Sequence, residues 1–267
     1  MSDVDVFLDW QRRCRRIGLM RRHAGRGREA VTFEYDPEWL AATDRFSMDP
    51  ALPVGPGVFR PPAGAEMFGT LGDSAPDTWG RMLMRRRERR AAEREGRAVR
   101  TLHETDFLLG VSDLTRLGAL RFRWQGEEVF QAPQSRGVPD MLALGDLLGA
   151  SQRIVRGDET DEDLRMIFAP GSSLGGARPK ASVVDQHGRL AIAKFPKETD
   201  EYSLERWEAI ALDLAAKAGI RTAAHELHEV ADRPVLLSRR FDRNGDERIP
   251  FLSAMHMTEP PDGEPAR

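Results

Sequence analysis

The order of elements after Gly171 constrains the fold of this chain more than any other feature. A glycine-rich loop, GSSLGGARP, is followed by a predicted strand, KASVV, a turn, DQHGR, and a second predicted strand, LAIAKF. A helix with apolar residues at helical spacing comes next. Two further predicted strands, Leu227–Val230 and Val235–Ser238, are joined by a turn. Loop, hairpin, helix and hairpin in this order predict an α+β arrangement.

The same segment contains the residue types that a nucleotide site needs. Phosphate oxygens are bound by backbone N–H groups, which a glycine-rich loop brings close enough. Gly175 and Gly176 lie in the loop, Lys194 ends the second strand and Glu208 lies on the following helix. A phosphate-binding lysine and a glutamate that fixes its direction occur in this order in protein kinases. Each residue alone is weak evidence, because the loop matches neither G-x-G-x-x-G nor the Walker pattern.

The part of the chain before this segment predicts a mixture of strands and helices. Strands at Gly18–Arg22 and Val31–Tyr35 flank the hairpin signal AGRG, and Asp36-Pro37 begins a short helix. Residues 47–66 contain five prolines and predict a long irregular loop. Further helices are predicted from Asp77, around Phe107–Leu109 and twice within 138–168, with a strand over Ala119–Trp124.

The helix after Asp77 is rich in arginine, with nine arginines between Arg81 and Arg100. It is the best candidate for nucleic-acid contact that the composition offers. We favour a solvated helix whose arginines pair with the interspersed Glu88, Glu93 and Glu95, because helix faces carry such pairs routinely. The formal net charge of −3 also argues against a polycation built for nucleic acid or membranes.

The composition and the N-terminal sequence point to the cytoplasm. Cys14 is the single cysteine, so an internal disulfide is excluded and a reducing compartment is expected. The start, MSDVDVFLDW, lacks the pattern of a signal peptide, and no stretch approaches the roughly 20 apolar residues that span a bilayer. The arginines beside Cys14 predict a lowered thiol pKa, although a structural or incidental thiol is the favoured interpretation.

Long motifs in the chain resemble the HipA family of serine/threonine protein kinase toxins, which belong to type II toxin–antitoxin systems. The segments SSLGGARPKASVVD, LAIAKFP, WEAIALDLAAKAGI, VLLSRRFDR and RIPFLSA resemble the kinase N-lobe of that family. The segments FGTLGDSAPDTWGR and TDFLLGVSDLTRLGALRF resemble its N-terminal region. The resemblance spans residues 4 to 255 and implies a HipA-like N-terminal subdomain over 1–125, a helical connection over 126–170 and a kinase-like N-lobe over 171–255. Residues 256–267 are expected to form a disordered tail.

The resemblance also implies roles for individual residues. Ser173 falls at the autophosphorylated serine of the loop, Lys194 at the lysine that binds the ATP phosphates and Glu208 at its helix partner. The implied ATP-binding set, which combines the loop, the lysines and the hinge strand, is Ser173, Leu174, Gly175, Gly176, Ala177, Lys180, Lys194, Glu208, Arg239, Arg240 and Phe241. ATP and Mg are the implied cofactors, a helix-turn-helix antitoxin the implied partner, and an aminoacyl-tRNA synthetase the implied class of substrate.

The residues that would perform phosphotransfer are not found in this sequence. A kinase needs a catalytic aspartate, an asparagine for metal and a second metal-binding aspartate, which the family carries in a D-x-H-x-x-N-type loop and a later motif. The acidic run FDRNGD is better explained as a hairpin turn, because Asn-Gly is a strong turn signal. His225 and His228 lack a third ligand at zinc spacing, so surface histidines are favoured. We therefore expect no catalytic residue, no metal site and an absent C-lobe.

Three functions remain open from the sequence. The chain is either a truncated or split kinase component that binds ATP weakly or not at all, or a non-catalytic regulatory module of a toxin–antitoxin system. A nucleic-acid-binding protein that uses the arginine helix is the third. A neighbouring reading frame that encodes the D-x-H-x-x-N segment would favour a split kinase, completed by a second chain. An absent lobe should also leave an apolar face uncovered, at residues such as Phe195, Leu236 and Phe251.

Overall fold

A computed structural model describes residues 3–25, 29–132, 138–168 and 176–258. Its contacts divide the chain into two compact units, each assembled from separate stretches of sequence. Unit 1 comprises Met1–Ala75, Thr101–Pro133 and Asp246–Arg267, and unit 2 comprises Pro76–Arg100 and Gln134–Gly245. The fold is a mixture of helices and strands, as the sequence predicts.

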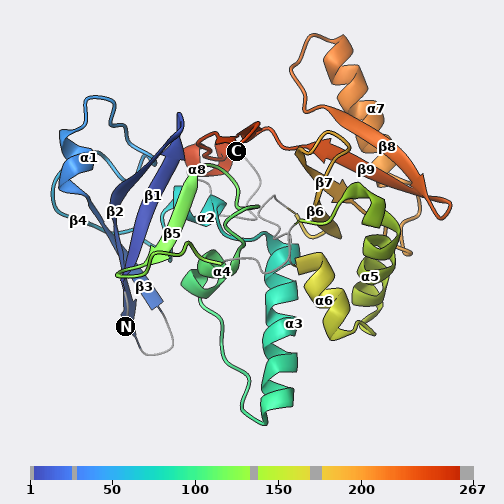
Figure 1. Cartoon of the computed structure of the whole chain (residues 1–267), viewed down its shortest axis with the longest axis horizontal. Helices are drawn as coiled ribbons and strands as arrows, with labels where there is room; N and C mark the ends of the chain where they lie inside the picture. Colours follow the sequence, from blue (N-terminus) through green and yellow to red (C-terminus); the bar gives the residue numbers. More distant parts are fainter. Residues whose placement is uncertain (1–2, 26–28, 133–137, 169–175, 259–267) are drawn as a thin grey trace. The chain divides into compact units, whose positions relative to one another are not determined.

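Unit 1 is built on a five-stranded antiparallel sheet in the order β4-β3-β2-β1-β5. Its strands are β1 (Val4–Trp10), β2 (Arg13–Ala24), β3 (Glu29–Tyr35), β4 (Val58–Phe59) and β5 (Leu120–Trp124). Its helices are α1 (Pro37–Ala41), α2 (Gly69–Asp73), α4 (Glu104–Gly110) and α8 (Ala254–Thr258), and the unit also contains the short β11 (Glu247–Arg248). Figure 1 shows these elements at the blue, green and red parts of the chain.

The core of unit 1 follows from the alternation of apolar residues along its central strand. Val4, Val6 and Leu8 are all buried and recur every second residue of β1, so they lie on one face of the sheet. Phe33 of β3 and Phe68 beside α2 are fully buried in the same cluster, with their rings edge-on. The helices of the unit therefore cover one face of a twisted sheet.

Unit 2 is built on a four-stranded antiparallel sheet in the order β6-β7-β9-β8. Its strands are β6 (Lys180–Val184), β7 (Leu190–Lys194), β8 (His225–Val230) and β9 (Arg233–Arg239), followed by the short β10 (Arg243–Asn244). Its helices are α3 (Thr78–Glu95), α5 (Leu144–Arg156), α6 (Asp161–Phe168) and α7 (Leu204–Lys217), with a 3-10 turn, η1 (Met141–Ala143). Figure 1 shows α5 and α6 on one side of this sheet and α7 on the other.

The two faces of the unit 2 sheet have different compositions. Small and branched apolar residues, Ala181, Val183, Ala193, Val235 and Leu237, are buried in one cluster with residues of α3, α5 and α6. Residues that pair directly across antiparallel strands share a face, and Lys180 pairs with Lys194. The face opposite to the core therefore carries both lysines.

The boundaries of the compact units differ from the linear segments expected from the sequence. Helix α3 falls in the expected N-terminal subdomain, but its Trp79 and Leu83 are buried in the core of unit 2. Residues after Asp246 group with unit 1, where Arg248 pairs with Asp113 at 3.2 Å. Residues 256–258 end helix α8, so they are not part of a disordered tail, and 259–267 lie outside the described residues.

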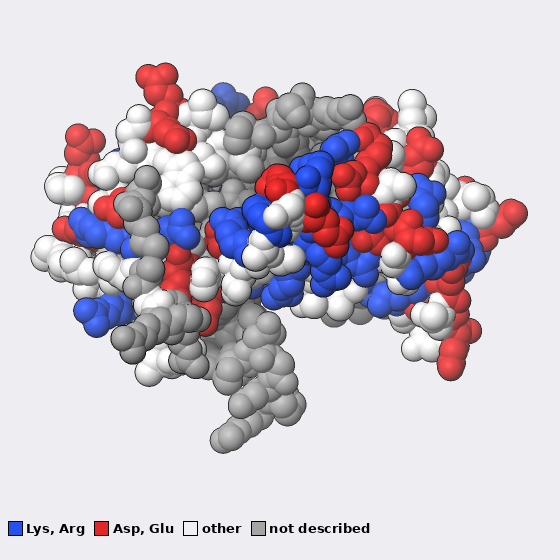
Figure 2. All heavy atoms as spheres, turned by 90° about the horizontal axis from the view of Figure 1, so that it is seen from below, with Lys and Arg blue, Asp and Glu red and all other residues white. Residues whose placement is uncertain are grey.

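The arginines in and after α3 pair both with the interspersed Glu88 and Glu95, as the favoured interpretation expects, and with Glu159 and Asp161 outside the helix, which the sequence did not suggest. Asp77 accepts a hydrogen bond from the Gly80 amide at the start of α3, and Gly96 ends the helix with a positive φ of 61°. Arg86 donates to Glu159 of unit 2 at 2.7 Å, and Glu159 is buried. Further pairs join Arg90 and Arg94 to Asp161 and Arg97 to Glu88. Figure 2 shows acidic and basic side chains interleaved on the face seen from below.

Membrane insertion through a helix is not indicated by the structure. Over the residues whose placement is described, the helices are all too short or too polar to cross a bilayer.

Arg116 is a buried cation that holds several loops of unit 1 together. Its guanidinium lies over the ring of Phe122 and donates to backbone carbonyls of four separate positions, Ser74, Leu108, Val111 and Gln131. Burial lowers the pKa of Arg116 to about 9. The hydrogen bonds to these carbonyl groups therefore help to fix the buried guanidinium in place.

We expect Arg116→Met to lower the free energy of unfolding by about 2 to 4 kcal/mol, because buried carbonyl groups lose their donors while the volume is largely kept. Urea unfolding followed by circular dichroism measures the change. The exposed Arg13 is the matched control, and Arg13→Met should leave stability unchanged. Equal effects of the two substitutions would show that the Arg116 hydrogen bonds do not stabilise the unit.

Candidate functional site

The candidate site lies on the lysine-bearing face of the unit 2 sheet. Strands β6 and β7 pair so that Lys180 stands directly opposite Lys194. The Nζ atom of Lys194 pairs with a carboxylate oxygen of Glu208 on α7. The lysine and glutamate that the sequence places 14 residues apart are thus brought together, with side chains 30 % and 39 % exposed. A partly exposed pair of this kind is within reach of a ligand.

Helix α7 owes its position to its N-terminal cap and to its contacts with the sheet. The Ser203 hydroxyl accepts a hydrogen bond from the Arg206 amide and starts the helix. Glu208 follows within the second turn, and α7 packs on β8 and β9. Because β9 is hydrogen-bonded to β7, a glutamate at this place on α7 reaches the end of β7. The cap and the packing of α7 on the sheet therefore place Glu208 where it can pair with Lys194.

Lys180 has a more enclosed environment than Lys194. Its side chain is 4 % exposed, and Nζ lies 2.5 Å from Asp77 Oδ2 and 3.2 Å from the Gly176 carbonyl oxygen. Burial lowers the pKa of Lys180, Asp77 opposes that effect, and Lys194 adds a smaller lowering. The site thus contains two lysines, each paired with a carboxylate from a different helix.

The loop before β6 is anchored at both ends of its described part. The Gly176 carbonyl accepts a hydrogen bond from the Trp79 amide at 3.3 Å, and Gly176 has a φ of 110° that favours glycine. Ala177 is exposed. Ser173, Leu174 and Gly175, which the sequence predicts as the centre of the phosphate-binding loop, lie outside the described residues.

Arg178 ties the end of the loop to α7. Its guanidinium pairs with Asp200 at 2.5 Å and with the buried Glu205 at 3.0 Å. The hydrogen bond from Arg178 lowers the pKa of Asp200. Sequence reasoning missed this cluster, because three charged residues spread over 28 positions carry no local pattern that predicts their meeting.

The predicted hinge residues occupy three different environments. Arg239 ends β9, paired with Ala191, and is half-buried. The Arg240 side chain is buried and forms two hydrogen bonds of 2.6 Å with Asp242. Phe241 is 54 % exposed. Of the three, Phe241 has the most surface accessible to a ligand, whereas Arg240 forms a buried ion pair with Asp242.

Other candidate chemistries have little support. Within the described ranges, no group of three or more His, Cys, Asp or Glu residues is arranged to hold a metal ion. The Asp242 carboxylate is taken up by Arg240 and Arg243, and Gly245 turns the chain with a φ of 60°. His225 lies near Asp213 and His228 near Glu226, so the two histidines have different partners.

The less favoured alternative for Cys14, a thiol activated by its arginine neighbours, is not supported. Partial burial raises the pKa of Cys14, and the nearby Asp9 raises it further. The neighbouring arginines are engaged elsewhere, since Arg15 pairs with Asp44 and Arg16 with Asp5. A thiol in this setting is a weak nucleophile.

The predicted uncovered apolar face is wrong for two of its three residues. Phe195 and Leu236 are fully buried, whereas Phe251 is partly buried and lines a cavity of unit 1. Several large apolar side chains of unit 2 are exposed, and three of them lie on α7, where Trp207, Ile210 and Leu214 are 59 %, 46 % and 59 % exposed. These three residues recur at helical spacing, so they form one apolar stripe. We call Trp207, Ile210 and Leu214 the α7 stripe.

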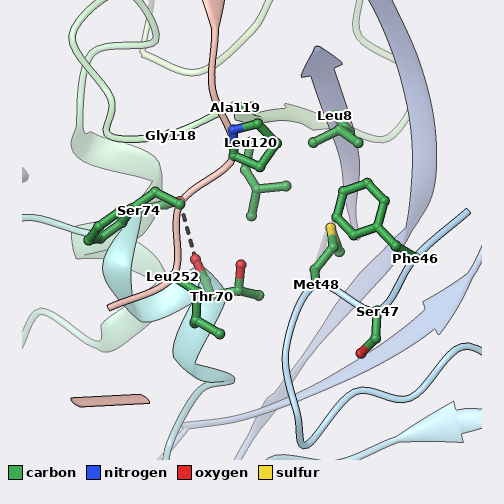
Figure 3. Close-up of a pocket in the computed structure, with 12 residues that line it drawn as sticks. Leu8, Phe46, Ser47, Met48, Thr70, Ser74, Gly118, Ala119, Leu120 and Leu252 are labelled. Carbon is green, nitrogen blue, oxygen red and sulfur yellow. Dashed lines mark hydrogen bonds between the residues drawn. The ribbon is translucent and has the colours of Figure 1, made fainter. Parts of the chain in front are cut away.

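A separate cavity lies in unit 1. It has a volume of about 230 Å³ and is lined mainly by apolar side chains, among them Leu8, Phe46, Met48 and Leu252 (Figure 3). The Ser74 hydroxyl at its wall is directed to the Thr70 and Leu117 carbonyl oxygens. This cavity contains no lysine or arginine, so it lacks the positive charge that a triphosphate requires.

Two family models match separate parts of the chain. A family model described as the HipA N-terminal domain matches residues 5–122, and one described as the HipA-like C-terminal domain matches residues 172–265. A comparison with curated protein sequences gave no significant match.

One matching solved structure comes from Shewanella oneidensis MR-1 and is described as a complex of the toxin–antitoxin proteins HipA and HipB with their operator DNA. It is 18 % identical to this chain, with a TM-score of 0.53. The match covers 92 % of this chain and 53 % of that chain, so this chain spans about half the length of its structural relative. At this identity, the likeness shows a shared fold.

We expect Trp79→Phe to loosen the start of β6, because the indole Nε1 donates to the Lys180 carbonyl oxygen at 3.0 Å and phenylalanine keeps the packing but removes the donor. Hydrogen–deuterium exchange of the peptide that covers residues 176–184 should become faster by roughly fivefold to tenfold, as the loss of about 1 kcal/mol implies. Trp207→Phe on the exposed α7 stripe is the control. Unchanged exchange in Trp79→Phe would contradict a role for this hydrogen bond.

Proposed function

This chain belongs to the HipA family, and we propose that it is the nucleotide-binding part of a HipA-type serine/threonine protein kinase that acts as the toxin of a toxin–antitoxin pair. The observation that carries the proposal is the pairing of Lys194 with Glu208 beside a second lysine, Lys180. The two lysines share one face of a four-stranded sheet and follow a glycine-rich loop. This arrangement meets the needs of a triphosphate, which are positive charge and backbone amides.

Different residues of this chain would bind the phosphates and the base of ATP. Lys194, directed by Glu208, would contact phosphate oxygens from the sheet, and Lys180 would do so from the base of the loop. Phe241, exposed next to the end of β9, would provide an apolar surface for the base. ATP, accompanied by Mg, would supply the transferable phosphoryl group.

The polypeptide of 267 residues is not expected to transfer phosphate by itself. Its sequence contains no D-x-H-x-x-N segment, so it offers no aspartate to orient an acceptor hydroxyl. We propose that these groups are supplied by a kinase C-lobe. The α7 stripe supports a partner for unit 2, since three large apolar side chains on one helix face are costly to leave in water.

The proposed biological partners follow from the family. A helix-turn-helix antitoxin would bind the toxin, in line with the description of the Shewanella structure as a complex of HipA with HipB and DNA. The proposed substrate of the complete kinase is a protein of the aminoacyl-tRNA synthetase type. The pairing of the α3 arginines with acidic residues supports a protein partner over direct binding of nucleic acid.

A non-catalytic regulatory module is the second candidate. It is favoured by the lack of a catalytic loop in the sequence together with the intact sheet and helices of unit 2. The two functions differ in nucleotide binding, because a regulatory module needs only its partner surface. Binding of ATP through Lys194 would therefore favour the kinase component.

We expect Mg-ATP to bind saturably but weakly, with a Kd on the order of 1 mM, because half of the adenine cleft would belong to the C-lobe. Lys194→Ala should abolish saturable binding, since it removes the exposed positive charge of the site. Lys217→Ala, at the exposed end of α7, is the matched control and should bind like the unmodified protein. Calorimetric titration measures all three. Binding that survives in Lys194→Ala would place the nucleotide elsewhere.

We expect the polypeptide alone to show no transfer from labelled ATP, and a complex with a C-lobe polypeptide to phosphorylate Ser173. A phosphoserine adds about −1.5 to −2 charges and would compete with ATP for the loop amides. The complex should therefore lose activity with time, more slowly in Ser173→Ala, while Ser172→Ala serves as control. Mass spectrometry locates the phosphate. Transfer by the polypeptide alone, or equal inactivation rates in all three proteins, would contradict these roles.

A further inference from the structure

Helix α3 begins with a residue whose two carboxylate oxygens have different tasks. Asp77 Oδ1 accepts a hydrogen bond from the Gly80 amide at 2.8 Å and caps the helix. Asp77 Oδ2 lies 2.5 Å from Lys180 Nζ. The side chains of Asp77 and Lys180 are 3 % and 4 % exposed. A capping aspartate alone would need only the first contact, so the second one joins the helix to the nucleotide site.

The backbone of the same helix end holds the segment on which Lys180 lies. The Trp79 amide donates to the Gly176 carbonyl, and the Trp79 indole donates to the Lys180 carbonyl. Asp77 and Trp79 therefore fix the two ends of residues 176–180 and the ammonium group between them. The motif that contains both residues, DTWG, lies about 100 positions before the loop in the sequence.

Burial makes the charge of Lys180 depend on its surroundings. An ammonium group that leaves water is favoured only when an opposite charge accompanies it. Among the described residues, the charged groups that act on the pKa of Lys180 are Asp77 from α3, Lys194 from β7 and Glu208 from α7. Lys194 disfavours the charged form, and Glu208 is paired with Lys194. Asp77 is in direct contact with Lys180.

We propose that Asp77 is a positioning residue for nucleotide binding, which keeps Lys180 charged beside Gly176, on the face of the sheet that Lys180 shares with Lys194. An ammonium group has three donors, so Lys180 can keep Asp77 while it exchanges another partner for a phosphate oxygen. This inference rests on the proposed function, since it assumes a phosphate ligand on this face of the sheet. It adds the N-cap residue of α3 to the site.

The test compares Asp77→Asn with Asp140→Asn in the full 267-residue polypeptide. Asparagine is as good a helix cap as aspartate and has nearly the same size, so the substitution removes mainly the charge. Asp140 caps η1 through the Leu142 amide at 2.9 Å, which makes it a matched control in the same unit. NMR titration with Mg-ATP from about pH 6 to about pH 8.5 gives the Kd, and the ¹³Cε signal of Lys180 reports its charge.

We expect Asp77→Asn to weaken Mg-ATP binding by roughly tenfold at the upper end of this range and by less at the lower end. The sign follows from the lysine: it is charged below its pKa, and without Asp77 that charge is lost at a lower pH. The Lys180 signal should titrate at lower pH in Asp77→Asn and should be unchanged in Asp140→Asn. Asp77→Ser, which also caps but has no charge, should behave like Asp77→Asn and replaces it if that variant does not fold.

The outcomes separate this inference from the proposed function. If the unmodified protein binds Mg-ATP and Lys194→Ala does not, while Asp77→Asn binds equally or more tightly, the role of Asp77 is overturned and the proposed function stands. If the unmodified protein shows no saturable binding, the proposed function falls and this role falls with it. Weaker binding in Asp77→Asn with an unshifted Lys180 titration would also overturn it, because the effect would then be structural.

Discussion

The site depends on the register of the hairpin formed by β6 and β7. With Lys180 opposite Lys194, both lysines lie on the face of the sheet that is turned away from the apolar core. A shift of one residue in this pairing would put Lys180 opposite Ala193, so the two lysines would no longer share a face. The small residues on the core face, Ala181, Ala191 and Ala193, allow α3, α5 and α6 to pack closely. The register of β6 and β7 therefore determines both the packing of the core and the position of the two lysines on the opposite face.

The two lysines are paired with carboxylates in contrasting ways. The Lys194–Glu208 pair is partly exposed, so solvent screens it and a ligand can compete for it. The Lys180–Asp77 pair is buried, so breaking it leaves a charge in a poorly solvated place. In the proposed site, Lys194 of the exposed pair could leave Glu208 for a phosphate oxygen, whereas the buried pair would hold Lys180 in place. Removing Asp77 should thus have a larger structural effect than removing Glu208.

Local signals in the sequence account for much of unit 2. The hairpins around DQHGR and ADRP and the turn at Asn244-Gly245 each leave a recognisable pattern in the sequence, and all three were predicted in place. The hairpin of β1 and β2 was not identified, because Gln11 and Arg12 adopt φ values of 52° and 59° without a glycine or asparagine to signal the turn. Which core a helix joins is decided by partners distant in sequence, so the place of α3 in unit 2 was missed.

Long-range contacts also limit what sequence can say of the site. Lys194 and Glu208 were predicted as a pair and the structure brings them together. The contact of Asp77 with Lys180 spans 103 positions, and the cluster of Arg178, Asp200 and Glu205 joins a loop to a helix. The burial of Phe195 and Leu236 likewise depends on long-range packing. The sequence of a strand does not indicate whether another element covers the face on which an apolar residue lies.

Mapping of Mg-ATP on the protein by two-dimensional NMR tests the central claim most directly. The claim predicts saturable shifts of the Gly176, Lys180 and Lys194 amides and of the hinge at 239–241, and their loss in Lys194→Ala. Shifts centred on the unit 1 cavity at Leu8, Phe46 and Leu252, or shifts that do not saturate, would contradict it.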